Sequence, residues 1–148
     1  MCEMGPKMPG QSRAGYFNLA FVSCFWLGLC AQGCGSSPTP PTISNFSLSP
    51  GIATLGTAGG KAQVSLQFTF EDVGGDLSSL TITKYDADGI LLYASTGPLN
   101  GTAGQTSGQI GGTMKMDTQT EGHFVYELFV TDSAGAASNK LTATFVVS

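Results

Sequence analysis

Acidic side chains form the densest groups of potential ligands in this sequence. Glu71, Asp72 and Asp76 lie within EDVGGDL, and Asp86 and Asp88 lie within YDADG. Ca²⁺ takes about six to eight oxygen ligands, and glycine lets backbone carbonyls turn toward an ion. The two groups therefore predict a weak calcium site if neighbouring loops bring them together. The competing interpretation is that Asp and Gly simply form tight turns here, with an ordinary hairpin at YDADG.

A catalytic site has much less support. His123 is the single histidine and stands beside Gly122 at the opening of a strand-like segment, which places it on an outward face. A histidine base needs a nucleophile or an acid within hydrogen-bond reach. The sequence contains no Gly-x-Ser-x-Gly, His-Glu-x-x-His or Ser-x-x-Lys motif. We therefore expect no catalytic residues and no enzymatic activity.

The cysteines gather near the start of the chain, and Cys34 is the last of them. Residues 14–31 form a strongly apolar stretch, with Lys7 and Arg13 before it and small residues after it. A positively charged region, then an apolar region, then small residues is the order found in a secretory signal. The stretch also approaches the ~18 residues of a membrane-spanning helix. An uncleaved N-terminal membrane helix and a plain secretory signal are therefore the alternatives to a lipid-modified leader.

The segment LCAQGCGSSP resembles the lipobox of bacterial lipoproteins, in which a small residue precedes a cysteine that receives diacylglycerol. Gly33 and Cys34 fit this pattern, whereas Ala31 and Gln32 replace its usual leucine and small residue. The resemblance implies that residues 1–33 are a signal peptide and that lipid on Cys34 anchors the protein to a membrane. It also implies the envelope of a bacterium, at the outer membrane or cell surface. Acyl chains contribute ~0.8 kcal/mol per buried CH₂, so several chains hold a protein durably.

Charge and cysteine content exclude several other classes of protein. Beyond residue 34 the chain has four lysines and nine acidic residues, which leaves a net charge near −5. A surface of this sign repels phosphate backbones, and no basic cluster with aromatic residues is present, so we expect no nucleic-acid partner. No cysteine follows Cys34. The folded part therefore has neither a disulfide nor a cysteine-ligated metal, and we expect no cofactor other than calcium.

The elements that must position these residues are strands. After a flexible linker over residues 34–42, strict alternation predicts strands at 62–72, 123–132 and 140–147. Weaker alternation predicts strands at 43–49, 80–86, 90–96 and 110–116, with Asp- and Gly-rich turns between them. About seven short strands in just over one hundred residues indicate a single all-β sandwich over residues 43–148. An apolar leader helix is expected before the linker.

Residues Gly122-His-Phe124-Val-Tyr126 and the tail VTDSAGAASNKLTATFVV resemble the last two strands of immunoglobulin-like domains. This broad family includes bacterial Ig-like, fibronectin type III and PKD modules. Tyr126 replaces the cysteine that makes the inter-sheet disulfide in antibody domains. We therefore expect Leu66 and Phe68, packed against Tyr126 and Leu128, to hold the two sheets together.

These observations favour a non-catalytic, lipid-anchored surface protein whose Ig-like domain has a structural or adhesive role. Its protein or glycan partner is not encoded in any motif. A carbohydrate-binding module is the first alternative, because sandwiches often present aromatic rings to sugars, and Tyr85, Tyr93 and Phe129 could face outward together. A calcium-dependent adhesion module is the second. The Gly-rich segment 97–112, predicted to be a long hairpin loop, is the expected place for a binding surface.

Overall fold

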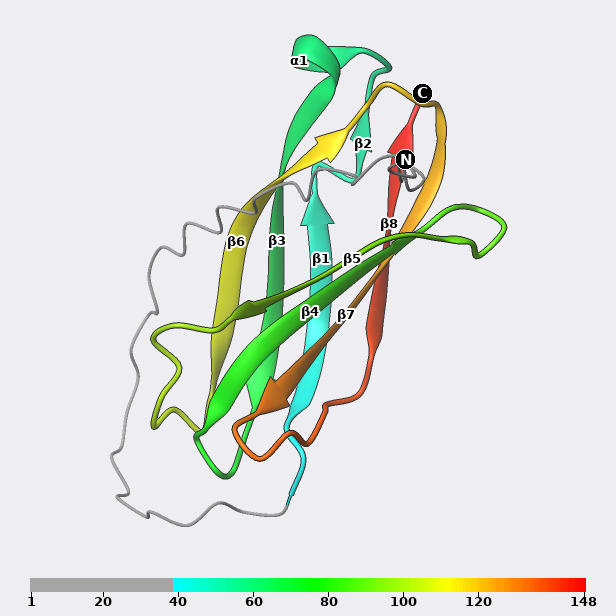
Figure 1. Cartoon of the computed structure of the whole chain (residues 1–148). Helices are drawn as coiled ribbons and strands as arrows, with labels where there is room; N and C mark the ends of the chain where they lie inside the picture. The colour runs from blue at the N-terminus through cyan, green and yellow to red at the C-terminus, as the bar shows by residue number, and fades with distance from the viewer. Residues whose placement is uncertain (1–38) are drawn as a thin grey trace, which may run out of the picture.

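The computed structural model describes residues 39–148, which form two β-sheets packed face to face (Figure 1). The predicted leader helix, Cys34 and most of the linker lie outside the described residues. The strands are β1 (Thr42–Ser49), β2 (Ile52–Ala53), β3 (Lys61–Glu71), β4 (Leu77–Tyr85), β5 (Leu91–Pro98), β6 (Ser107–Asp117), β7 (Gly122–Asp132) and β8 (Leu141–Val147), with one helical turn, α1 (Thr57–Gly60). No helix within residues 39–148 has the length and hydropathy needed to cross a membrane.

The strand order confirms the predicted Ig-like sandwich. One sheet has the order β1-β3-β6 and the other the order β2-β8-β7-β4-β5. The penultimate strand β7 therefore lies between the last strand β8 and the third long strand β4, as in the sheet of immunoglobulin-like domains that carries their final hairpin. All the long neighbouring strands are antiparallel, and the short strand β2 pairs with β8 in parallel.

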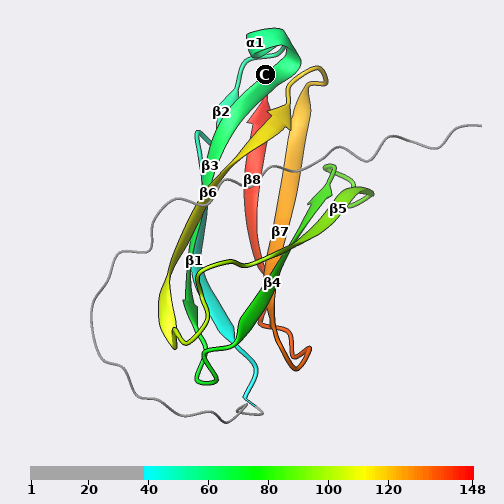
Figure 2. The same ribbon diagram turned by 60° about the vertical axis from the view of Figure 1, so that its left-hand side comes forward.

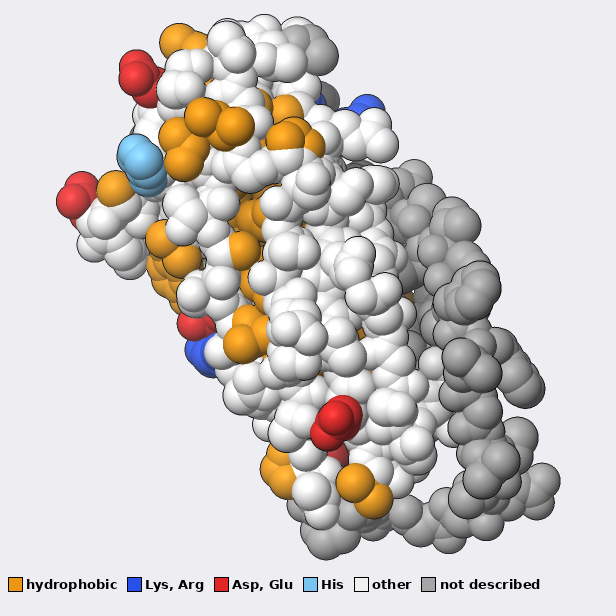
Figure 3. Space-filling model, turned by 180° about the vertical axis from the view of Figure 1, so that it is seen from behind, with side chains coloured by type: hydrophobic (Ala, Val, Ile, Leu, Met, Phe, Trp, Pro, Cys, Tyr) orange, Lys and Arg blue, Asp and Glu red, His pale blue; other side chains and the backbone are white. Residues whose placement is uncertain are grey.

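The core comes from the alternation visible in the sequence. Along β3 every second side chain is buried, from Ala62 to Phe70, and β7 repeats the pattern from Phe124 to Val130. Leu66, Phe68, Tyr126 and Leu128 all belong to the one buried cluster that joins the two sheets. The outward side chains of β3 and β6 are mostly Ser, Thr, Gln and Gly, so the back of the molecule shows few charges (Figure 3).

The two ends of the sandwich differ in what they carry. We call the end where β1 begins the lower end; there Thr42 pairs with Glu71, and Leu77 pairs with Asp132. The upper end holds the β4–β5 hairpin, the β6–β7 turn, α1 and the last residues of β8 (Figure 1). The linker that precedes β1 therefore reaches the domain at its lower end.

On one side of the sandwich a side chain makes the pair of backbone hydrogen bonds that a neighbouring strand would make. The Asn139 side-chain amide donates to the carbonyl oxygen of Ile43 at 2.9 Å, and its oxygen accepts from the Ile43 N–H at 2.8 Å. These bonds join β1 to the segment that leads into β8, two residues before that strand begins. Higher up, β2 pairs with β8 through Ile52 and Val146. Asn139 thus covers the start of β1, and β2 covers the end of β8.

The connection between β5 and β6 differs from the predicted long hairpin loop. Gly97 and Pro98 belong to β5 and residues 107–112 belong to β6, so the connection is only 99–106. It crosses from one sheet to the other, since β5 and β6 lie in different sheets. Thr102 is buried and its hydroxyl donates to the Leu77 carbonyl, while the Gly104 N–H donates to Gly75. These contacts hold the connection against the lower end.

Candidate functional site

The two acidic groups lie at opposite ends of one strand. Asp76 immediately precedes β4 and Asp86 immediately follows it. A strand rises about 3.3 Å per residue, so its nine residues separate the groups by roughly 30 Å. No single ion contacts both groups, and the expectation that neighbouring loops bring them together is wrong. Within residues 39–148 no group of three or more His, Cys, Asp or Glu side chains is arranged to hold a metal.

The lower acidic group is built into a turn. Asp72 is only 1% exposed, and its carboxylate accepts the N–H of Asp76 at 2.8 Å and that of Gly74 at 3.2 Å. The Asp76 carboxylate accepts from the hydroxyl of Ser133 on the neighbouring β7–β8 turn. Glu71 is exposed at the end of β3. The buried carboxylate therefore satisfies backbone donors of its own loop.

The upper acidic group forms the β4–β5 hairpin. The Asp86 carboxylate accepts the N–H of Asp88 at 3.0 Å and that of Ile90 at 2.8 Å. Gly89 takes a positive φ of 78°, which the turn requires and glycine adopts without strain. Asp88 is exposed at the tip of the hairpin. This arrangement is the Asp- and Gly-based turn that was the competing interpretation of YDADG.

The predicted row of outward aromatic residues is split between the two faces of the five-stranded sheet. Tyr85 pairs with Val125, and Phe129 lies on the same outer face as Val125. Tyr93 instead pairs with Lys84, whose other neighbour is the buried Tyr126, so Tyr93 lies on the inner face. The cause is a register shift in the β4–β5 ladder between Lys84 and Tyr85, because a one-residue slip moves side chains to the opposite face.

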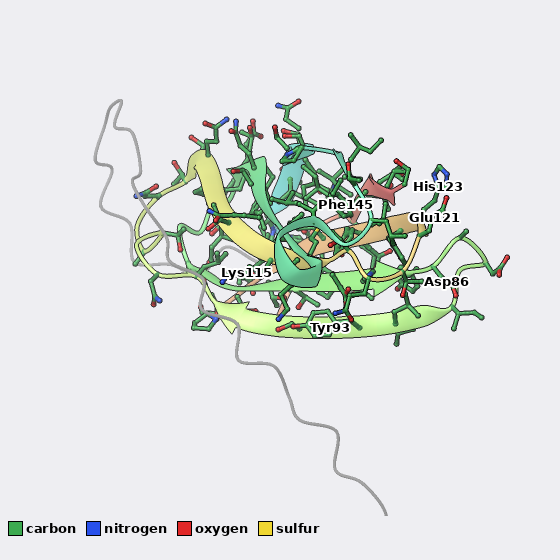
Figure 4. The ribbon with its side chains drawn as sticks, turned by 90° about the horizontal axis from the view of Figure 1, so that it is seen from above. Asp86, Tyr93, Lys115, Glu121, His123 and Phe145 are labelled. Atoms are coloured by element: carbon green, nitrogen blue, oxygen red, sulfur yellow. The ribbon has the colours of Figure 1, made fainter. Side chains whose placement is uncertain are left out.

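Outward apolar residues gather on the upper half of the five-stranded sheet. Pairing places Leu91 beside Tyr85 and Tyr85 beside Val125, and at the top places His123 beside Val146 and Val146 beside Ile52. We call the following set the apolar outer face: Ile52, Tyr85, Leu91, Val125 and Val146. Ile52 is 57% exposed and Leu91 is 58% exposed. His123 points away from the molecule at the rim of this face, whereas Phe145 points between the sheets (Figure 4).

A charged pair borders the apolar outer face on its lower side. The Lys140 ammonium lies 2.9 Å from a Glu127 carboxylate oxygen and 5.5 Å from the centre of the Phe129 ring. The hydrogen bond to Glu127 and its negative charge raise the pKa of Lys140, and so does Tyr85. Sequence patterns do not reveal this grouping, because it draws on β7, β4 and the residue before β8.

A second lysine lies on the inner side of the sheet. The Lys84 ammonium lies 3.7 Å from the centre of the Phe124 ring, and partial burial lowers the pKa of Lys84 while the charge of Asp117 opposes that effect. Burial, aided by Asp117, raises the pKa of the nearby Tyr126 phenol. No buried polar side-chain atom of residues 39–148 lacks a hydrogen-bond partner. The position of Lys84 between the sheets was not predicted, because a lysine in an alternating strand is normally taken to be solvent-exposed.

Comparisons with known proteins give structural likenesses alone. No protein-family model and no curated protein sequence matches this chain. The PKD domain of an M14-like peptidase from a Thermoplasmatales archaeon is 18% identical, with a TM-score of 0.45, covering 75% of this chain and 98% of its own. A CARDB domain from Pyrococcus furiosus, solved in complex with di-metal ions, is 13% identical, with a TM-score of 0.39 and coverages of 74% and 90%. Bacteroides uniformis β-glucuronidase 2 is 14% identical, with a TM-score of 0.44, and the match covers 72% of this chain and 13% of the enzyme.

Proposed function

We propose that this protein is a lipid-anchored module of a bacterial cell envelope that acts without catalysis, by contact with another protein. The observation that carries the proposal is the position of the apolar outer face. The linker reaches the sandwich at its lower end, and the most exposed members of the face, Ile52 and Leu91, lie at the upper end. An anchor at Cys34 therefore holds the apolar face away from the membrane.

The chemistry of the face favours a protein partner over a sugar. Its members are aliphatic except for Tyr85, and Ile, Leu and Val offer packing surface but no ring for a sugar to stack on. Exposed apolar surface bordered by polar residues is typical of interaction sites. The Lys140–Glu127 pair and the threonines of β4 and β8 supply such a border.

The absence of catalysis is proposed on the site chemistry. His123 is exposed at the rim of the sheet, and the carboxylates of Asp72 and Asp86 accept hydrogen bonds from backbone groups of their own turns. The Asp76 carboxylate meets the hydroxyl of Ser133 at the lower end, but His123 lies at the opposite end of β7, so no histidine stands beside that pair. A base without a positioned partner contributes little to a reaction.

The anchor is tested by the intact mass of protein extracted from bacterial membranes. A chain starting at Cys34 with a mass increase equal to diacylglycerol and an acyl chain supports the proposal. A Cys34→Ser variant is the matched control, and it is expected to lose the mass increase and leave the membrane fraction. An unmodified mature chain, or a chain that keeps residues 1–33, contradicts the anchor.

Carbohydrate binding is the second candidate, because Tyr85 and Phe129 share the outer face. It is tested by retention of the protein on insoluble polysaccharides and by glycan arrays. Binding that Tyr85→Ala or Phe129→Ala abolishes, and that Tyr93→Ala leaves intact, would favour this candidate. No binding to any glycan supports the protein-contact proposal.

A further inference from the structure

The two sides of the sandwich are protected unequally. On the side of β1 and β8, Asn139 bonds to the start of β1 and β2 pairs with the end of β8. On the other side, β5 is the last strand of its sheet and pairs only with β4. No described element lies beyond β5, which runs along the margin of the molecule (Figure 2). Its outer row of backbone N–H and C=O groups is therefore available to another strand.

The ladder fixes which residues of β5 present these groups. Ser79 pairs with Pro98, and the Leu99 N–H donates to the Ser78 carbonyl. This makes Ser79–Pro98 a non-hydrogen-bonded pair, and such pairs alternate with hydrogen-bonded pairs along an antiparallel ladder. The backbone groups of Thr96 and Ala94 consequently point away from β4, toward the open edge.

The composition of this edge is unusual for one that stays free. Native edge strands are normally blunted by charged side chains, proline or glycine-rich irregularity. The neighbouring open edge, β6, carries Lys115 and Asp117 and several glycines. β5 has no charged residue along its whole length, and its glycine and proline, Gly97 and Pro98, stand only at its end. Leu91 and Leu92 are both about half exposed.

We propose that β5 pairs antiparallel with β5 of a second copy, around a two-fold axis through Ser95. Ala94 of one copy then exchanges backbone hydrogen bonds with Thr96 of the other. Tyr93 of one copy lies opposite Gly97 of the other, so the tyrosine ring covers the glycine, which has no side chain. Leu92 lies opposite Pro98, and the N–H that proline lacks falls at the end of the ladder. The same residues meet in both directions, as an isologous dimer requires.

Charge selects the antiparallel arrangement. The hairpin that precedes β5 carries Asp86 and Asp88. A parallel pair would place two such hairpins side by side and repel. The antiparallel pair places each hairpin beside the segment 99–106 of the other copy, which contains no charged residue. An N-terminal segment of the same chain is a poor alternative occupant, since Pro38, Pro40 and Pro41 cannot donate to a ladder.

The dimer is tested on the chain from Gly35 onward, which contains every strand and the whole buried core. Sedimentation from micromolar to millimolar concentration is expected to show a monomer–dimer equilibrium. Ala94→Pro removes an N–H from the open edge and none from the β4 ladder, and should weaken the dimer by about tenfold or more. Thr113→Pro is the matched control, because its N–H faces the open edge of β6; it should leave dimerisation unchanged.

Cysteine cross-linking tests the register. Ser95→Cys places two thiols directly opposite each other in a non-hydrogen-bonded pair, within the Cα separation that a disulfide tolerates. Thr96→Cys is the control, because its own copies are offset along the strands to roughly 8 Å, beyond that range. The chain from Gly35 contains no cysteine of its own, so any disulfide dimer reports on the introduced residue.

Fast oxidation of Ser95→Cys to a dimer, with Thr96→Cys remaining monomeric, is the expected result. Circular dichroism of every variant separates loss of the dimer from loss of the fold. A wild-type chain that stays monomeric throughout the concentration range overturns the proposal. So does equal weakening by Ala94→Pro and Thr113→Pro, or equal cross-linking of the two cysteine variants. The anchor at Cys34 plays no part in these measurements, so its failure and the failure of the dimer are distinguishable.

Discussion

The Asn139 bridge offers the sharpest test of how the sandwich is closed. Its amide makes two hydrogen bonds, of 2.8 and 2.9 Å, to the backbone of Ile43, which is only 5% exposed. A hydrogen bond contributes about 1 kcal/mol net. Asn139→Ala removes both partners of Ile43 at once, and water can replace them in part because Asn139 itself is exposed. We therefore expect a loss of about 2 kcal/mol in the free energy of unfolding.

The corresponding assay is urea denaturation followed by circular dichroism, with a thermal melt beside it. In a domain of this size 1 kcal/mol shifts the melting temperature by about 4–8 °C, so Asn139→Ala should lower it by roughly 10 °C or more. Gln109→Ala is the matched control, since it removes an exposed amide from the outer face of β6. That substitution should change stability by less than about 0.5 kcal/mol.

Asn139→Asp adds a pH dependence with a defined sign. A carboxylate accepts from the Ile43 N–H but faces the Ile43 carbonyl, whereas a protonated carboxyl can donate to that carbonyl. Folding therefore raises the pKa of the introduced carboxyl above its unfolded value of about 3.9. The stabilisation is present below the unfolded pKa and is lost as pH rises through the folded pKa. A stability that is flat over this range, or an Asn139→Ala variant as stable as Gln109→Ala, would refute the bridge.

Further predictions concern the core, the lower loop, calcium and alkaline pH. Phe68→Ala should cost about 3–5 kcal/mol in a denaturation curve because Phe68 is wholly buried, while the exposed Val73→Ala should change little. Asp72→Ala should cost about 1–3 kcal/mol, as two backbone donors lose their acceptor. Thermal midpoints in calcium and in chelator should coincide because the acidic groups are far apart; a clear rise with calcium would contradict this. Since burial raises the pKa of Tyr126, stability should fall as pH rises above about 10, and Tyr126→Phe should reduce that fall.

The architecture was predictable because it depends on local patterns. Alternation along β3, β7 and β8 decides which side chains are buried, and that information lies within each strand. The turns were predictable for the same reason, since Asp and Gly act on neighbouring backbone. The anchor at Cys34 also depends on a local pattern, and it stays a prediction because it lies outside the described residues.

The sequence by itself determined an all-β sandwich, its long strands and its Asp- and Gly-based turns. Only the tertiary structure decided how those pieces meet. It separated the acidic groups along β4, turned Tyr93 inward, joined Ile43 to Asn139 across 96 residues and left β5 at an open edge. Each of these outcomes depends on strand order or on register. Both are set by the packing of segments far apart in the chain, and a shift of a single residue exchanges the two faces of a strand.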